Sequence, residues 1–233
     1  MEHRNRSTDS IALIVGATGS IGGALNAALS SRGSFSEILA VSRPSLDVTR
    51  EESIASLAKQ IANSPGELTL AIDATGYLHD ANAMPEKSWH QLDPGHLMMA
   101  FKINAIGPAI LIKHLLPLMP RDRRSVFATL SARVGSISDN QLGGWYGYRS
   151  SKAALNQFVR TAAVELRRKK PLAICVALHP GTVESKLSAP FAKANLEVRP
   201  PTEAADQLLN VIDNLGPRHS GGFFDHRGDA IPW

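Results

Sequence analysis

Short apolar runs alternate along the chain with longer stretches in which apolar residues recur at helical spacing. The short runs show little alternation with polar residues, which is typical of strands covered on both faces. The expected strands are Ile11–Val15, Glu37–Val41, Leu68–Ile72, Ser125–Leu130 and Ala173–Leu178, with a short closing strand at Gly222–Phe224. The expected helices are Ile21–Ser31, Glu51–Asn63, His96–Leu118, Ser150–Lys169 and Thr202–Leu215.

Strands that alternate with helices in this way predict an α/β fold. Its core is one doubly wound parallel sheet with helices on both faces and right-handed crossovers. The 233 residues contain no linker, repeat or low-complexity segment. A single domain spanning residues 1–233 is therefore the economical expectation.

Charge and cysteine content bear on whether the protein binds nucleic acid and on the compartment in which it works. The formal net charge is only +4, and the basic run Arg167–Lys170 ends an expected helix, where cations suit the helix dipole. No aromatic residues interleave with these charges, so a solvated helix end is favoured over a nucleic-acid surface. The single cysteine, Cys175, indicates a reducing compartment. Without a signal-type N-terminus or an uninterrupted apolar run of membrane length, we expect a cytoplasmic protein with no membrane or nucleic-acid partner.

A glycine-rich turn follows the first expected strand and opens the first expected helix. Its glycines are Gly16, Gly19 and Gly22. A dinucleotide pyrophosphate needs a tight turn, close backbone approach and the free N–H groups of a helix N-terminus. The spacing departs from the common G-x-G-x-x-G pattern, and a glycine-rich turn can simply connect a strand to a helix. The position in the first strand–turn–helix unit favours a dinucleotide site in a Rossmann-type fold.

The end of the second expected strand bears on the choice of cofactor. It reads Val41-Ser42-Arg43-Pro44, with no carboxylate to bind the ribose hydroxyls of NAD. Ser42 and Arg43 together suit the 2′-phosphate of NADP(H), which is therefore favoured over NAD(H). The alternative is that Arg43 is an exposed loop residue.

A tyrosine and a lysine four residues apart, Tyr148 and Lys152, stand in the sequence Tyr148-Arg-Ser-Ser-Lys152. On a helix the two side chains share one face, so the ammonium is expected to lower the pKa of the phenol and to reach the nicotinamide ribose. Tyr146 is a weaker candidate because its fourth neighbour is Ser150. With the glycine-rich turn at the matching distance, the whole chain resembles the short-chain dehydrogenase/reductase family and its Y-x-x-x-K motif.

The resemblance implies further site residues. Asp47-Val48 resembles the motif that meets the adenine, and residues 73–76 resemble the segment beside the adenosine. Asn104 matches the asparagine that positions a water near the lysine, and residues 180–185 match the segment that grips the carboxamide. The cofactor-binding residues so implied are Gly16, Thr18, Gly19, Ser20, Ile21, Gly22, Ser42, Arg43, Asp47, Val48, Ala74, Thr75, Gly76, Asn104, Tyr148, Lys152, Pro180, Gly181, Thr182, Val183 and Ser185.

The sequence departs from the family pattern at several positions. Val15 and Ser20 replace a common threonine and glycine, and Asp73-Ala74 replaces two asparagines. The substrate-orienting serine usually lies three residues before a glycine. Counting back from Gly135 gives Ala132, so Ser131 is the expected catalytic serine, with Ser136 as the substitute.

The resemblance implies an NADP(H)-dependent oxidoreductase that interconverts a small-molecule carbonyl and alcohol, without a metal. Tyr148 would transfer the proton, Ser131 would polarise the oxygen, and Asn104 and Lys152 would complete a proton path. The apolar segment Leu187–Pro201 would be a substrate loop or an ordinary connector. A homodimer or homotetramer is also implied.

The sequence leaves two questions open. Within the family the chain resembles the C-factor-like branch, which is associated with cell–cell signalling. The alternative function is therefore a cofactor-binding signalling or regulatory protein with little turnover. The displaced serine favours this alternative, and the intact Tyr148–Lys152 pair opposes it. The C-terminal Ile231-Pro232-Trp233 can pack on a neighbour or cover its own pocket.

Overall fold

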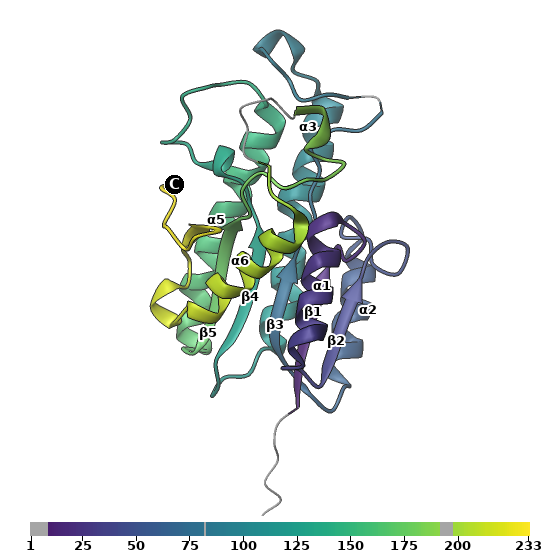
Figure 1. Cartoon of the computed structure of the whole chain (residues 1–233), viewed down its shortest axis with the longest axis vertical. Helices are drawn as coiled ribbons and strands as arrows, with labels where there is room; N and C mark the ends of the chain where they lie inside the picture. Colours follow the sequence, from purple (N-terminus) through teal and green to yellow (C-terminus); the bar gives the residue numbers. More distant parts are fainter. Residues whose placement is uncertain (1–8, 82, 192–197) are drawn as a thin grey trace, which may run out of the picture.

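The computed structural model describes residues 9–81, 83–191 and 198–233. A six-stranded sheet runs through its centre in the order β2-β1-β3-β4-β5-β6, with every neighbouring pair parallel (Figure 1). The strands are β1 (Ser10–Val15), β2 (Glu37–Val41), β3 (Glu67–Asp73), β4 (Ser125–Leu130), β5 (Ala173–His179) and β6 (Phe223–Asp225). The α-helices are α1 (Ser20–Arg32), α2 (Glu51–Ala62), α3 (Pro94–Phe101), α4 (Gly107–Leu115), α5 (Tyr146–Lys169) and α6 (Pro201–Asn214). The expected doubly wound α/β fold is confirmed.

Helices cover both faces of the sheet because alternate strand residues point to opposite sides. Ile11 and Leu13 of β1 pack with α2, α4 and α5, whereas Ala12 and Ile14 pack with α1 and α6. In Figure 1, α1 and α6 lie in front of the sheet and α2 and α5 lie behind it. The central parts of the strands are therefore apolar on both faces, as their sequences predicted.

The carboxyl ends of the strands lie level with one another. Val15 pairs with both Val41 and Asp73, and Asp73 pairs with Thr129. From β1 the chain first goes to β2 on one side and then returns to β3 on the other. The crevice between the ends of β1 and β3 is thus the switch point where doubly wound folds bind their ligands.

The predicted helix His96–Leu118 is interrupted in the structure. After α3 comes a π-helical turn, Lys102–Ile106, which is followed by α4 and a 3₁₀ turn, Leu116–Leu118. Pro108 has no N–H to donate to the carbonyl four residues earlier, and the Gly107 N–H instead reaches back five residues to Lys102. Apolar periodicity does not show such a change in backbone hydrogen bonding.

The span Pro94–Leu118 is long and apolar enough to cross a membrane, by length and composition alone, with a mean hydropathy of 1.4. This finding qualifies the sequence-based expectation that no such run exists. The span packs on α2 and α5 in the structure, and 39% of its most apolar stretch is buried.

Phe127 lies at the centre of the core and tests the packing between the sheet and the helices. Its side chain is only 1% exposed, so Phe127→Ala should lower the free energy of unfolding by about 3–5 kcal/mol. Leu142→Ala is the control, because Leu142 is 92% exposed and should change stability by less than about 0.5 kcal/mol. Urea unfolding measures both, and equal losses would contradict this description of the core.

Candidate active site at the carboxyl edge of the sheet

The glycine-rich turn brings three stretches of backbone into contact. Gly16 has a φ of +86°, and a Cβ there would lie 3.0 Å from the carbonyl carbon of Ala74. A Cβ on Gly22 would lie 2.2 Å from the carbonyl oxygen of Gly16. Gly19 is the residue before α1, so Ser20 and Ile21 belong to its first turn, where backbone N–H groups have no partner within the helix. The turn therefore has the form that a bound phosphate requires.

The end of β2 is tied to this turn. Thr18 N–H donates to the Ser42 Oγ at 2.9 Å, and Gly16 N–H donates to the Val41 carbonyl at 2.8 Å. The Arg43 side chain is exposed, and within the described residues no hydrogen bond or ion pair holds it. It is a cation beside the turn, as its predicted role requires.

The Asp47-Val48 segment leads into α2. One oxygen of the Asp47 carboxylate accepts hydrogen bonds from the backbone N–H and the hydroxyl of Thr49, at 2.9 and 2.8 Å. These two bonds hold the pKa of Asp47 below its ordinary value. Val48 packs over Gly107 at the start of α4. Asp47 is therefore ionised and fixed at the edge of the crevice.

Asp73 ends β3 with a buried carboxylate that is 1% exposed. Its Oδ1 accepts from the Thr75 backbone N–H at 3.0 Å and from the Thr75 hydroxyl at 2.6 Å. Its Oδ2 accepts from the Thr129 hydroxyl of β4 at 2.7 Å. The aspartate that replaces an expected asparagine is thus fully engaged, and it orders the loop that contains Ala74, Thr75 and Gly76.

Asn104 lies in the π-helical turn and is fully buried. Its Oδ1 accepts from Tyr77 N–H at 2.8 Å, and its Nδ2 donates to the Tyr77 carbonyl at 2.7 Å and to Ser151 Oγ at 3.0 Å. It therefore links the loop after β3 to α5. Its expected part in a proton path stays a prediction.

Tyr148 and Lys152 lie on one face of α5, with the lysine Nζ 5.9 Å from the centre of the tyrosine ring. Nζ donates to the Leu130 carbonyl at 2.7 Å. Burial lowers the pKa of Lys152 to about 8, although the charge of Asp73 opposes the change. Burial also raises the pKa of Tyr148 to about 12. The expected lowering of the phenol pKa by Lys152 is wrong for this structure, because burial dominates and the ammonium is bonded to a carbonyl.

Both candidate serines are engaged within the protein. The Ser131 hydroxyl is 3% exposed and donates to Asn156 Oδ1 at 2.7 Å. The Ser136 hydroxyl is 1% exposed and accepts from Asp139 N–H at 3.2 Å. Neither bond leads to Tyr148, and Ala132 holds the position three residues before Gly135. The choice of serine stays a prediction.

The segment after β5 is pinned by a short bridge. Gly181 has a φ of +78°, Val183 pairs with Arg199, and Arg199 N–H donates to the Thr182 carbonyl at 2.9 Å. Ser188 Oγ donates to the Val183 carbonyl at 2.6 Å and contacts Ser185 Oγ at 3.1 Å. Residues Pro180–Ser185 thus follow β5 at the same edge as the other site segments. Part of the expected substrate loop, residues 192–197, lies outside the described residues.

Three aromatic rings form a row beside the Tyr148–Lys152 pair, and sequence reasoning did not identify this row. The Trp145 ring contacts Tyr148 and Phe191, with centres 6.2 and 4.9 Å apart, and Phe191 contacts His79 at 5.5 Å. These rings come from three separate loops. The available signal was Gly143-Gly144 just before Trp145, since all three residues have a φ between 52° and 64°. Only glycine adopts that conformation freely.

Asp73 should couple electrostatically to Lys152, and this coupling can be tested without substrate. Asp73→Asn keeps the side-chain shape and removes the charge that favours protonated Lys152. In the wild type the folded pKa of Lys152, about 8, lies below the ordinary lysine value of 10.5, so stability rises as pH increases between these values. In the variant the folded pKa falls further. Its deficit in unfolding free energy should be largest near about pH 6, should shrink as the pH rises through about 8, and should be nearly absent above that, where folded Lys152 is neutral in both proteins.

Urea unfolding between about pH 6 and 10 measures this deficit. Asp213→Asn serves as the control, because Asp213 is exposed and pairs with Arg32 and not with Lys152. A deficit of constant size across the pH range would rule out the coupling.

Comparison with known proteins agrees with this geometry. A family model described as enoyl-(acyl carrier protein) reductase matches residues 24–206. The C-signal protein of Myxococcus xanthus is 37% identical over 142 residues, which cover 61% of this chain and 81% of that protein. The 1-hydroxy-2-glutathionyl-2-methyl-3-butene dehydrogenase of Rhodococcus sp. (strain AD45) is 33% identical over 190 residues, which cover 82% of this chain and 79% of that enzyme.

A solved structure has the same fold. The NADPH-bound carbonyl reductase from chicken fatty liver superposes with a TM-score of 0.77 at 22% identity, over 97% of this chain and 94% of that one. At that identity the likeness concerns the fold alone, whereas the family model and the Rhodococcus relative extend it to the sequence. The chain belongs to the short-chain dehydrogenase/reductase family, whose members are NAD(P)-dependent oxidoreductases.

Proposed function

We propose that this oxidoreductase uses NADP(H) to interconvert a small-molecule carbonyl and alcohol, with Tyr148 as the general acid and base. One observation carries the proposal. The Tyr148–Lys152 pair lies at the same edge of the sheet as the glycine-rich turn, with Lys152 Nζ bonded to the last residue of β4. A half-buried phenol and a buried ammonium at this place suit proton transfer to a bound substrate.

The glycine-rich turn suits a dinucleotide because its backbone segments lie so close together that side chains at positions Gly16 and Gly22 would not fit. The first turn of α1 would hold the pyrophosphate, and the loop after Asp73 would line the adenosine. Ser42 and Arg43 would bind a 2′-phosphate, and Asp47 would meet the adenine. When bound, the nicotinamide supplies the hydride. The residues of Pro180–Ser185 would orient its carboxamide.

The chain's own residues would supply the proton. With a pKa of about 12, the Tyr148 phenol is protonated at neutral pH and can donate to a carbonyl oxygen that gains negative charge. Lys152, with a pKa of about 8, is the group of the pair that titrates nearer neutrality. We therefore assign Lys152 the role of returning a proton to Tyr148, with Asn104 ordering a water along the path.

The oxygen of the substrate needs a second donor. Ser131 would supply it by exchanging its bond to Asn156 for one to the substrate, and Ser136 is the substitute. The aromatic row of His79, Phe191 and Trp145 supports a substrate with an apolar group beside its carbonyl.

The proposal extends to assembly and location. Phe158 and Val164 on α5 are each 43% exposed, which supports a homodimer or homotetramer in which this helix is covered. The single cysteine supports a cytoplasmic location.

A second candidate is a signalling or regulatory protein with little turnover. Its support is the internal bonding of both serines and the 37% identity to the C-signal protein. NADPH oxidation measured against a panel of carbonyl compounds discriminates between the candidates. No turnover on any compound, with NADPH bound normally, would favour the second.

Replacing Tyr148 by Phe removes only the hydroxyl that donates the proton. Turnover should fall by about 10²–10⁴-fold, while the NADPH dissociation constant stays within about twofold. Tyr146→Phe is the matched control, because Tyr146 has no lysine four residues later and should keep wild-type turnover. Steady-state kinetics and fluorescence titration give the two quantities, and an active Tyr148→Phe enzyme would remove Tyr148 from the mechanism.

Replacing Arg43 by Ala tests the choice of cofactor. The loss of a charged contact to the 2′-phosphate should weaken NADPH binding by about 10–100-fold and change NADH binding by less than about twofold. Arg50→Ala, at another exposed arginine in the same loop region, should leave both affinities unchanged. Equal weakening of NADPH and NADH in Arg43→Ala would refute the phosphate role.

A further inference from the structure

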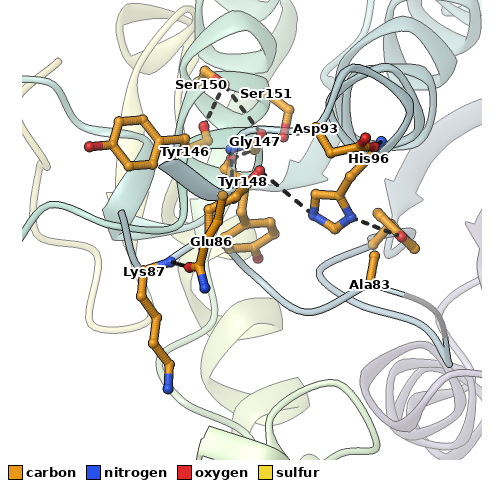
Figure 2. Close-up of polar contacts among 12 residues, drawn as sticks. Ala83, Glu86, Lys87, Asp93, His96, Tyr146, Gly147, Tyr148, Ser150 and Ser151 are labelled. Carbon is orange, nitrogen blue, oxygen red and sulfur yellow. Dashed lines mark hydrogen bonds and ion pairs between the residues drawn. The ribbon is translucent and has the colours of Figure 1, made fainter. Parts of the chain in front are cut away.

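Glu86 is a buried carboxyl group to which the proposed mechanism gives no part. It lies in the loop between β3 and α3 and is 2% exposed. Figure 2 shows its side chain between the His96 ring and the first turn of α5. Its Oε2 accepts a hydrogen bond from Gly147 N–H at 3.2 Å, and its backbone carbonyl accepts one from Trp145 N–H at 2.5 Å. Glu86 therefore holds the backbone on both sides of Tyr146.

The other carboxyl oxygen faces a polar side chain without bonding to it. Glu86 Oε1 lies 4.0 Å from His96 Nε2 and has no hydrogen-bond donor among the described residues. His96 Nδ1 in turn lies 3.4 Å from the hydroxyl of Tyr77, which donates to Asp80 Oδ2 at 2.9 Å. Burying a carboxylate that is only partly satisfied is costly, so such a group calls for a reason. The positive end of the α5 dipole, at Gly147, lowers the cost and favours this placement.

The backbone that Glu86 holds is in an unfavourable conformation. Gly143, Gly144 and Trp145 are successive residues with positive φ, and for tryptophan this conformation is strained. The guanidinium of Arg149 holds the carbonyl side of the turn, since its Nε donates to the Gly143 and Gly144 oxygens at 3.2 and 3.0 Å. Glu86 holds the amide side, through the Trp145 N–H.

Gly147 allows this close approach. A Cβ at this position would lie 3.1 Å from Glu86 Oε1 and 3.2 Å from Leu97 Cδ2, which is tighter than ordinary contact. The glycine stands directly before Tyr148 and two residues after Trp145. A displacement of this turn would therefore move both aromatic rings that border the proposed reaction site.

We propose that Glu86 is a positioning residue that fixes Trp145 and Tyr148 by anchoring the first turn of α5. It touches neither substrate nor cofactor, and it acts through the two backbone N–H groups that it binds. Its kinetic consequence rests on the proposed function, whereas its structural consequence does not.

Two variants and a control measure the kinetic consequence. Glu86→Ala removes the side-chain acceptor of Gly147 N–H and leaves the backbone carbonyl that binds Trp145 N–H. The first turn of α5 should then shift, and kcat should fall by about 10–100-fold, as expected for a misplaced catalytic group, with NADPH affinity within about twofold. Glu86→Gln keeps an oxygen for Gly147 N–H and loses the charge, so it should retain more of kcat than Glu86→Ala. Glu165→Gln makes the same change on the exposed far part of α5 and should behave as wild type. Wild-type kcat in both Glu86 variants would overturn the proposal.

A second measurement needs no substrate. In a Trp89→Phe, Trp233→Phe background, Trp145 is the remaining tryptophan. Glu86→Ala should shift its emission to longer wavelength, and amide exchange in residues 143–150 should become faster, with Glu86→Gln between it and wild type. If Glu86→Ala does not fold, Glu86→Gln alone decides. Unchanged emission and exchange in the folded variants would refute the positioning role of Glu86. If emission and exchange change as expected but the wild type shows no turnover, only the proposed function is refuted.

Discussion

Asp73 carries a charged group at the point where the sheet reverses its winding, with only 1% of its surface exposed. Such a charge persists in the interior only when donors surround it, and here Thr75 and Thr129 supply three. Burial lowers the pKa of Lys152, and the charge of Asp73 partly offsets this change. The loop after β3, the end of β4 and the ammonium near Tyr148 are thereby linked by one carboxylate. A neutral asparagine could hold the loop in the same shape but could not act on the lysine.

The features predictable from the sequence were those with a local or periodic cause. Strands covered on both faces read as largely apolar runs, so all six were found with the correct direction and order of appearance. The glycine-rich turn was found because a Cβ at Gly22 would overlap the Gly16 carbonyl, and only glycine meets such a constraint. Tyr148 and Lys152 were correctly placed on one helix face, because residues four apart in a helix lie one above the other.

The features that escaped prediction depend on partners distant in the chain. The pKa of Tyr148 follows from its burial and from where the Lys152 ammonium points, and neither is a property of the motif. The π-helical turn depends on a hydrogen bond that Pro108 cannot make. Glu86 follows a proline in a polar loop and reads as a surface residue until α5 is placed against it. The serine question is of the same type, because Asn156 of α5 decides where the Ser131 hydroxyl points.

Trp145 shows a conflict between two demands on one residue. Its ring borders Tyr148 and Phe191, while its backbone has a φ of 52° that glycine or asparagine would adopt with less strain. Changes that improve folding at this position therefore remove the ring, and changes that keep the ring retain the strain. Directed evolution for thermal tolerance alone would be drawn toward a smaller residue here and would remove the ring beside Tyr148 as a side effect. Among relatives, the identity of this residue would then record how strongly each enzyme has been selected to discriminate among substrates.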